Sequence, residues 1–478
     1  MNHNISKNYI YNLLYQFINV IIQLITLPYL SRVIGEDGIG IQSYTNSVIS
    51  IIMIFAVLGI DWYGQREIAN SIHKKKERSL VFYELIIIKF ISFVILSLII
   101  YGFIILDKKY SIYYSILLIW YFGNMLDISW MYKGVEDFKV ISIRNIIVKI
   151  TGIILIFLFI KTKKDVAKYI FILSITTFIG NLLMWIGLSK FVDNIHIKEL
   201  KIKRHFKPLL QYFIPTIATS IYLLLDKSMI GRITHSDAQN GYYEQAIQVV
   251  NMLKTIVLSY NSVMISRMTI MFKNNNRELT TKTIDNSFEF LMFISWPICF
   301  GILSVGQEFV TLYYGHSFTC VANILYIFSP IIIFVAISNL LESHIITPLN
   351  MRSNGNLAVI LGAITNFILN IFLIRRLEAI GAAIASVISE LVIAVVYIIY
   401  TNKIYNFKHI VNNMYKKIIA SIIMYIVINR CIHLSVSNID YMIIKILLGI
   451  FVYGFILFIL NDKFIYNSMK YIKEKIIN

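Results

Sequence analysis

The chain has 478 residues, of which 58% are hydrophobic and 15% are charged, and its mean hydropathy is +0.71. Soluble domains carry about a quarter of charged residues, so this composition excludes an ordinary soluble protein and predicts an all-α membrane protein. The net charge of +18 follows mainly from the loops described below, so no nucleic-acid partner is expected.

Long apolar stretches recur along almost the whole sequence. Most cover roughly 18 to 25 residues, which is enough for a helix to cross a hydrocarbon core about 30 Å thick. About fourteen transmembrane helices are predicted, near residues 8–30, 41–60, 80–105, 112–131, 146–160, 169–188, 209–225, 242–266, 284–306, 319–342, 357–374, 380–400, 418–432 and 441–460. The chain is therefore expected to be a multi-pass membrane protein.

Basic residues are distributed unevenly between the predicted loops. With the N-terminus in the cytoplasm, the inner loops and termini hold 28 of the 44 lysines and arginines, and the outer loops hold 11. This bias satisfies the positive-inside rule. An even number of spans then places both termini in the cytoplasm, and we expect the protein to lie in the cell (cytoplasmic or inner) membrane.

The longest inner loop, residues 189–207, follows the sixth span and divides the chain. We predict an N-terminal six-helix lobe over 1–200, a C-terminal six-helix lobe over 201–400, and accessory helices 13 and 14 with a cytoplasmic tail over 401–478. A weak internal repeat supports this division: RVI (32–34) with GIGIQ (38–42) resembles RI (232–233) with GYYEQ (241–245), about 200 residues later. Two such lobes would be pseudo-symmetric and point the same way across the membrane.

The first span carries a stripe of amide side chains at helical spacing. Its members are Asn12, Gln16, Asn19 and Gln23. An amide without a partner is costly in hydrocarbon, so this face is expected to meet water or protein. The stripe is a candidate for the substrate path.

The eighth span repeats this pattern with Gln248 and Asn251, and Lys254 lies beside the polar face. A lysine in the middle of a span is typical of a substrate path. A structural ion pair with an acid from another span explains it equally well. Both interpretations stay open at this point.

Other charged residues also fall within the predicted spans. Lys89 lies deep in the third span. Acidic residues that could pair with the lysines or bind a coupling ion are Asp127, Asp226, Glu289 and Glu390. Cations for phosphate together with amides and hydroxyls for sugars would suit an anionic, sugar-bearing substrate, although other hydrophilic cargo would also fit.

Several chemistries have no recognisable motif in the chain. No glycine-rich loop ends in Gly-Lys-Ser/Thr, so direct use of ATP is not expected. The nine histidines show no metal-binding spacing, and no catalytic triad can be assigned. We expect no cofactor, no metal and no enzymatic activity.

A series of short motifs runs along most of the chain in a fixed order. They are LPYLSRVIG (27–35), GIG (38–40), DWYGQREIA (61–69), DISW (127–130), GVEDF (134–138), DKSMIG (226–231), GYY (241–243), SRM (266–268), FSP (328–330), GAAIA (381–385) and SE (389–390). In this order the motifs resemble the polysaccharide-transporter branch of the multidrug/oligosaccharidyl-lipid/polysaccharide flippase superfamily, the Wzx-type repeat-unit flippases of O-antigen and capsule clusters.

The resemblance implies two six-helix bundles that rock around a central cavity, plus an accessory pair of helices. It implies that an undecaprenyl-pyrophosphate-linked oligosaccharide is flipped from the inner to the outer leaflet, coupled to an H+ or Na+ gradient, beside polysaccharide assembly proteins. Arg32 and Arg66, which lie in its motifs, join the substrate-path candidates. At one outer turn relatives carry Leu-Ile-Pro and a glycine, whereas this chain has Arg375 and Glu378, so a different turn is expected there.

Two other functions remain as alternatives. A cation-coupled drug or metabolite extruder of the same fold would favour an acidic cavity, whereas the spans here carry both signs of charge and long amide stripes. A membrane polysaccharide polymerase or glycosyltransferase would usually display a large outer loop, but every predicted outer loop has fewer than about twenty residues. The sequence therefore favours the flippase.

Overall fold

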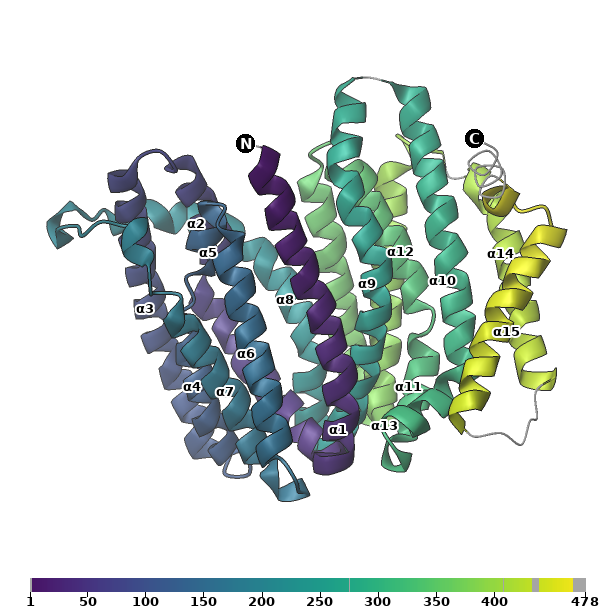
Figure 1. The fold of residues 1–478 in the computed structure, drawn as a ribbon, viewed down its shortest axis with the longest axis horizontal. Helices are drawn as coiled ribbons and strands as arrows, with labels where there is room; N and C mark the ends of the chain where they lie inside the picture. Colours follow the sequence, from purple (N-terminus) through teal and green to yellow (C-terminus); the bar gives the residue numbers. More distant parts are fainter. Residues whose placement is uncertain (1, 275, 407, 432–437, 467–478) are drawn as a thin grey trace. The chain divides into compact units, whose positions relative to one another are not determined.

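The structure is a computed structural model that describes residues 2–274, 276–406, 408–431 and 438–466. All regular secondary structure in these residues is helical, which confirms the predicted all-α fold (Figure 1). Over the described residues, each predicted span overlaps mainly with one helix or two consecutive helices. Among the described residues, eight helical segments are long and apolar enough to cross a membrane, so the protein is a multi-pass membrane protein.

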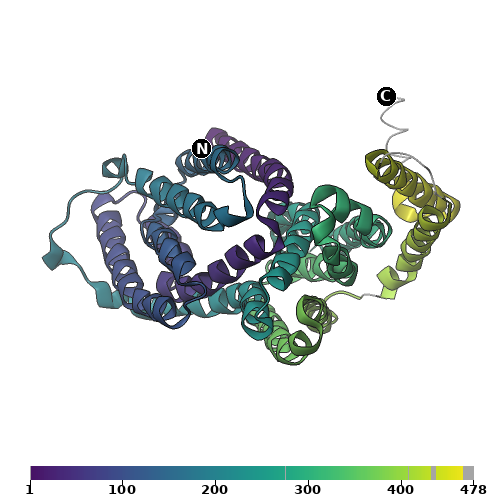
Figure 2. The ribbon, with the colours of Figure 1, turned by 90° about the horizontal axis from the view of Figure 1, so that it is seen from below.

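The chain forms two compact units, and the first comprises Met1–Gly241. Its α-helices are α1 (Asn2–Val57), α2 (Ile60–Asn70), α3 (Lys75–Leu106), α4 (Ser111–Met125), α5 (Ser129–Gly134), α6 (Phe138–Phe159), α7 (Val166–Leu183) and α8 (Phe206–Thr234). Helix α1 packs against α3, α6 and α8, and α4 packs along α7 (Figures 1 and 2). The unit extends beyond residue 200 because α8 packs on α1. The pseudo-symmetric relation of two six-helix lobes stays a prediction.

Helix α1 contains the first two predicted spans, joined at Gly35. This residue has φ 71° and ψ −177°, a conformation that is open almost only to glycine. This one non-helical residue bends the chain, so the two helical segments follow each other without a long loop between them. Gly35 thus explains why two spans follow each other with so little chain between them.

Two glycines of the internal repeat meet where α9 begins. A Cβ atom on Gly40 would lie 1.7 Å from the carbonyl oxygen of Asp237, and one on Gly241 would lie 2.1 Å from that of Glu36. Neither position has room for a side chain. The two copies of the motif therefore approach each other reciprocally, backbone against backbone, which gives the sequence similarity a structural reason.

The second unit comprises Tyr242–Asn478. Its α-helices are α9 (Asp237–Lys273, which starts in the first unit), α10 (Arg277–Tyr313), α11 (Cys320–Phe328), α12 (Ile331–Leu341), α13 (Arg352–Thr401), α14 (Lys408–Cys431) and α15 (Asn438–Ile459). A π-helical turn, Glu342–Ile346, follows α12. Helix α13 contains two predicted spans, which meet at Glu378 with φ 52° and ψ −129°. Glu378 is therefore a strained position, because a positive φ without a glycine is costly.

Helices α14 and α15 pack against each other and against α10 (Figure 1). Lys417 of α14 is 1% exposed, and it pairs with Glu289 of α10 and, at 3.1 Å, with Asp462 just after α15. Lys445 of α15 pairs with Glu308, farther along α10. Ion pairs at two levels of α10 therefore hold this accessory pair in place.

The basic loop before α8 is held by one buried acid. Glu84 of α3 accepts hydrogen bonds from Arg204 and His205, both at 2.6 Å. The other ring nitrogen of His205 lies 2.8 Å from the Tyr63 hydroxyl. This part of the basic loop is therefore structural, because Glu84 holds Arg204 and His205 against the helix bundle.

Candidate functional site

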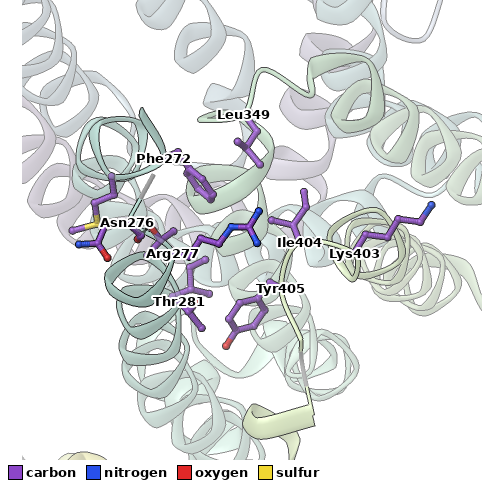
Figure 3. A pocket seen from close by; sticks show the side chains of 11 residues that line it. Phe272, Asn276, Arg277, Thr281, Leu349, Lys403, Ile404 and Tyr405 are labelled. Atoms are coloured by element: carbon purple, nitrogen blue, oxygen red, sulfur yellow. Dashed lines mark hydrogen bonds between the residues drawn. The ribbon is translucent and has the colours of Figure 1, made fainter. Parts of the chain in front are cut away.

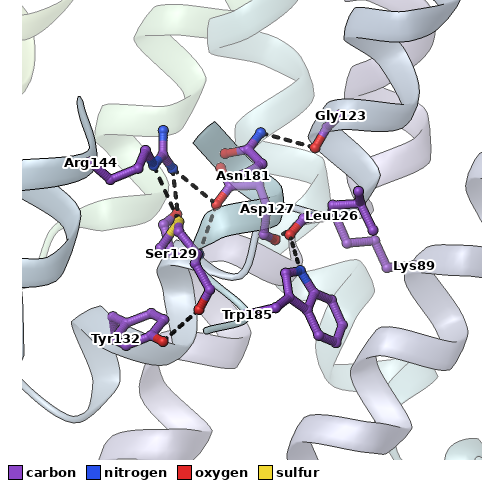
Figure 4. Close-up of polar contacts among 10 residues, drawn as sticks. Lys89, Gly123, Leu126, Asp127, Ser129, Tyr132, Arg144, Asn181 and Trp185 are labelled. Carbon is purple, nitrogen blue, oxygen red and sulfur yellow. Dashed lines mark hydrogen bonds and ion pairs between the residues drawn. The ribbon is translucent and has the colours of Figure 1, made fainter. Parts of the chain in front are cut away.

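Helix α4 stops inside the stretch that the sequence predicts as one span, 112–131, and three residues separate its end from the start of α5. The break frees backbone carbonyls at the end of α4, and side chains from α7 and beyond satisfy them (Figure 4). Asn181 donates to the Gly123 carbonyl at 2.9 Å. Trp185 donates to the Leu126 carbonyl at 2.8 Å. The break is thus a built feature of the bundle.

Lys89 of α3 reaches the same break. Its side chain is 1% exposed, and its Nζ donates to the backbone carbonyl of Asp127 at 2.7 Å. The ammonium thereby meets the negative end of the α4 dipole. The Asp127 carboxylate accepts the N–H of Ser129 at 2.8 Å and orders the first turn of α5. Two residues that the sequence nominates separately, Lys89 and Asp127, are therefore brought together.

Arg144 of α6 completes the arrangement. Its Nη2 lies 3.6 Å from Oδ1 of Asp127, and its Nε and Nη2 lie 3.3 and 3.0 Å from the sulfur of Met184. A thioether is a weak acceptor, whereas a guanidinium has five N–H donors. The contacts described leave Arg144 with spare donors in a geometry that suits phosphate or carboxylate oxygens.

A second acid, Asp61 of α2, interacts electrostatically with Lys89 and Asp127. We call Asp61, Lys89, Asp127 and Arg144 the α4–α5 cluster. Charged groups inside a membrane bundle are costly and concentrate along substrate and ion paths. Discontinuous helices are also typical of transporter binding sites, because their free ends and freed carbonyls can hold ions. The cluster is therefore a candidate site for anion or cation binding.

The second unit has its own polar zone between α9 and α13. Lys254 Nζ lies 3.8 Å from Oε1 of Glu390, and the two side chains are 14% and 11% exposed. Nearer the start of α9 than Lys254, the Gln248 side-chain amide donates to the Glu244 carboxylate at 2.7 Å. Asn251 of the same stripe is exposed. The structure thus brings Lys254 together with an acid from another span.

Deeper between the same two helices, a buried amide and hydroxyl network joins α9 to α13. Asn370 donates to Asn366 at 3.0 Å, and Asn366 donates to Ser386 at 3.4 Å. The Tyr243 hydroxyl lies 3.3 Å from the Ser386 hydroxyl. These hydrogen bonds link α9 to α13 within the second unit.

The remaining predicted path residues lie apart from both groups. The side chains of Asn12, Gln16 and Asn19 lie outside the described residues, and Gln23 is half-buried. Arg32 is exposed near the Gly35 bend. Arg66 is exposed and donates to the Tyr212 hydroxyl at 2.7 Å.

The acidic candidates have different surroundings. Asp127 and Glu390 belong to the groups described above, and Glu289 pairs with Lys417. Asp226 is buried, 4% exposed, and lies within α8, which continues to Thr234. The sequence instead predicts the end of a span at Asp226. Helix α8 continues past Asp226 to Thr234, so the end of the apolar run does not mark the end of the helix.

Sequence reasoning misses the half-buried Arg144 and the buried Lys417 as ion-pair partners. Arg144 falls in the predicted inner loop 132–145, yet α6 begins at Phe138, so the arginine lies well inside a helix. Lys417 falls at the end of the predicted loop 401–417, yet α14 begins at Lys408. Helical periodicity continued backward from each apolar run would have placed both residues on a helix face.

Comparison with known proteins identifies the family. The sequence profile of the family described as "Polysaccharide biosynthesis protein" matches residues 5–272, which is more than half of the chain. The chain belongs to this family. An O-antigen transporter of Escherichia coli K12 is 23% identical over 82% of the chain and 95% of its own length. A low-salt glycan biosynthesis flippase of Haloferax volcanii is 24% identical over 81% of each protein.

Solved structures show the same fold. The lipid II flippase MurJ in an inward closed conformation aligns with a TM-score of 0.67 and 18% identity, over 95% of this chain and 98% of MurJ. An inward-facing MATE-family multidrug transporter of the MOP superfamily aligns with a TM-score of 0.62 and 15% identity, over 80% and 94% of the two chains. This polysaccharide biosynthesis family member therefore has the MOP-superfamily fold that the motifs suggest.

Proposed function

We propose that this protein flips undecaprenyl-pyrophosphate-linked oligosaccharide repeat units, of O-antigen or capsule type, across the cytoplasmic membrane by alternating access. The observation that carries the proposal is the family match over residues 5–272. The relatives named as an O-antigen transporter and a glycan biosynthesis flippase support the same class of cargo. The MATE transporters share the fold, but at 15% identity or less their cargo does not transfer to this chain.

The α4–α5 cluster supplies chemistry that suits such a substrate. A pyrophosphate needs cationic donors, and Arg144 has spare donors beside Lys89. Asp127 and Asp61 would take up or release a proton or Na+ when the anionic substrate binds the nearby cations. This exchange would couple transport to an ion gradient. Asp226, Glu289 and Glu390 are further acids for this role, although Glu289 already has a lysine partner.

The proposal places both termini in the cytoplasm and the substrate on the inner leaflet before transport. The excess of basic residues in the inner loops supports this orientation. The stripe of Asn12, Gln16, Asn19 and Gln23 would add amide donors and acceptors for the sugars. We expect no chemical change in the cargo.

Deletion of the gene in its host tests the function. Surface polysaccharide should fall, and lipid-linked repeat units should accumulate in the inner leaflet. Arg144→Gln should restore export at least about tenfold less well than the wild-type gene, because a charge-assisted hydrogen bond is worth about 1.5–3 kcal/mol. Lys164→Gln, an exposed matched control, should restore export fully. Normal polysaccharide export without the gene would overturn the proposal.

A further inference from the structure

A pocket of about 380 Å³ lies in the second unit at the start of α10 (Figure 3). Its walls come from the end of α9, the first two turns of α10, the turn before α13 and the turn after α13. These segments belong to the inner loops 267–282, 343–356 and 401–417 of the predicted topology. The pocket shares no lining residue with the α4–α5 cluster or with the amide stripes, and its segments belong to the predicted cytoplasmic loops.

The pocket carries two positive charges. The Arg277 guanidinium lies in the middle of the pocket, and Lys403 lies at its rim with its ammonium directed outward (Figure 3). No described lining residue is acidic, and neither cation forms an ion pair with a described residue. A concave surface with one sign of charge concentrates counter-ions. The positive end of the long helix α10 adds to the same field.

Two acids of α10 lie near this pocket in sequence: exposed Glu278, which is not among the lining residues, and Asp285, which is already engaged. The Tyr405 hydroxyl, which lines the pocket, donates to the carboxylate of Asp285. Burial and this hydrogen bond raise the pKa of Tyr405, so the hydroxyl keeps its proton. Asp285 is thus turned toward Tyr405 and does not neutralise Arg277.

Two neutral polar side chains also line the pocket, Asn276 and Thr281. Asn276 accepts the N–H of Leu279 at 3.0 Å through its side-chain oxygen, which leaves its amide nitrogen free to donate toward the pocket. Thr281 adds a hydroxyl, whereas the Thr280 hydroxyl already donates to the Asn276 carbonyl at 2.7 Å. The polar half of the pocket therefore offers mainly donors, which suits an anion.

The other half of the pocket is apolar. Phe272, Leu349 and Ile404 lie around Arg277 (Figure 3). An inorganic anion held by Arg277 would leave this wall uncovered, because it has no apolar surface to place against these side chains. The wall therefore favours an anion that carries an apolar part.

We propose that this pocket binds the phosphate group of an amphiphilic anion, with Arg277 as the bidentate ligand and Lys403 as a second cation at the rim. A planar guanidinium matches phosphate oxygens in pairs, and a lysine on a flexible stem can follow a phosphate as a point charge. The headgroups of anionic phospholipids in the inner leaflet have this chemistry at this depth. Soluble phosphates share the anion but lack the apolar part. The site is additional to the transport path of the proposed function.

Binding to the purified full-length protein in a neutral detergent tests the site. The probes are dioctanoyl phosphatidylglycerol, zwitterionic dioctanoyl phosphatidylcholine and sodium pyrophosphate. We expect phosphatidylglycerol to bind more tightly than phosphatidylcholine. Tighter binding of pyrophosphate would assign the phosphate to a soluble source instead. No saturable binding of any phosphate probe would overturn the proposal.

Variants then assign the binding to this pocket. Arg277→Gln should weaken phosphatidylglycerol binding at least about tenfold, because a charge-assisted hydrogen-bonded pair is lost. Arg277→Lys should recover part of the affinity, and Lys403→Gln should have a smaller effect. Lys273→Gln is the matched control, since Lys273 is exposed at the same end but does not line the pocket. Unchanged affinity in Arg277→Gln with an unchanged unfolding temperature would contradict the assignment.

Discussion

At the scale of single residues, Lys254 and Glu390 allow a direct test of two roles. Their charged atoms lie 3.8 Å apart between α9 and α13. Lys254→Glu alone would bring two carboxylates together, which we expect to destabilise the protein by about 1–3 kcal/mol and to lower its abundance in the membrane. The exchange Lys254→Glu with Glu390→Lys should restore abundance, measured by immunoblot of the membrane fraction.

The same double variant separates a structural pair from a substrate contact. If Lys254 also meets the pyrophosphate, then export should stay low in the double variant although its abundance is normal. Lys254→Arg keeps the charge and should keep export. Full export by the double variant would mean that the pair serves only to join the two helices.

Lys89 has a different expected effect because it is buried in the α4–α5 cluster. Lys89→Met keeps the length of the side chain but removes the donor to the Asp127 carbonyl and one of the cations near Asp61 and Asp127. We expect the free energy of unfolding to fall by about 3–5 kcal/mol. Thermal unfolding in detergent measures it, with exposed Lys164→Met as the control. An unfolding temperature equal to that of the control would show that Lys89 is not paired.

Lys89 and Asp127 also show how far residue-level prediction reaches. Each is visible in the sequence because a charge interrupts an apolar run. Their contact is not visible, since it depends on a break in α4 that no proline or glycine signals at Leu126. Arg144 is missed because the predicted span begins where the apolar run begins, at residue 146, whereas α6 already begins at Phe138. Hydropathy therefore identifies buried charges better than it identifies their partners.

At the scale of elements, the two bends inside long helices make opposite predictions. Gly35 needs its glycine, so Gly35→Ala should destabilise the protein by about 1–3 kcal/mol. Glu378 has a positive φ without a glycine, so Glu378→Gly should stabilise it by about 1 kcal/mol. Unfolding temperatures of the purified variants measure both effects. A stabilising Gly35→Ala or a destabilising Glu378→Gly would contradict the backbone angles described.

The helices themselves are largely predictable, since apolar runs of spanning length have few alternatives in a membrane. The bends are less predictable. The sequence places a loop between the first two spans and another between the eleventh and twelfth, whereas Gly35 and Glu378 join each pair almost directly. The carbonyls freed by the break within the fourth span are satisfied by Asn181 and Trp185, and local periodicity does not contain that information. The break within the tenth span instead falls at Pro330, between α11 and α12.

At the scale of the whole molecule, the orientation is the first testable feature. Reporter fusions after Asn8 and after Asn478 should both report the cytoplasm, because 28 basic residues lie in the inner segments and 11 in the outer loops. The measurement needs a pair of reporters, one active inside and one active outside. An external signal from either terminus would mean an odd number of spans and would reverse the placement of the pocket at Arg277.

The central claim is that the chain moves a lipid-linked oligosaccharide between leaflets. The most direct measurement uses the purified protein in sealed vesicles that contain undecaprenyl-pyrophosphate-linked repeat units from the host, with a membrane-impermeant glycosidase outside. We predict that the protected fraction becomes accessible when the protein is present, faster with an imposed H+ or Na+ gradient, and much more slowly with Arg144→Gln. Accessibility that rises no faster than in protein-free vesicles, under either gradient, would contradict the claim.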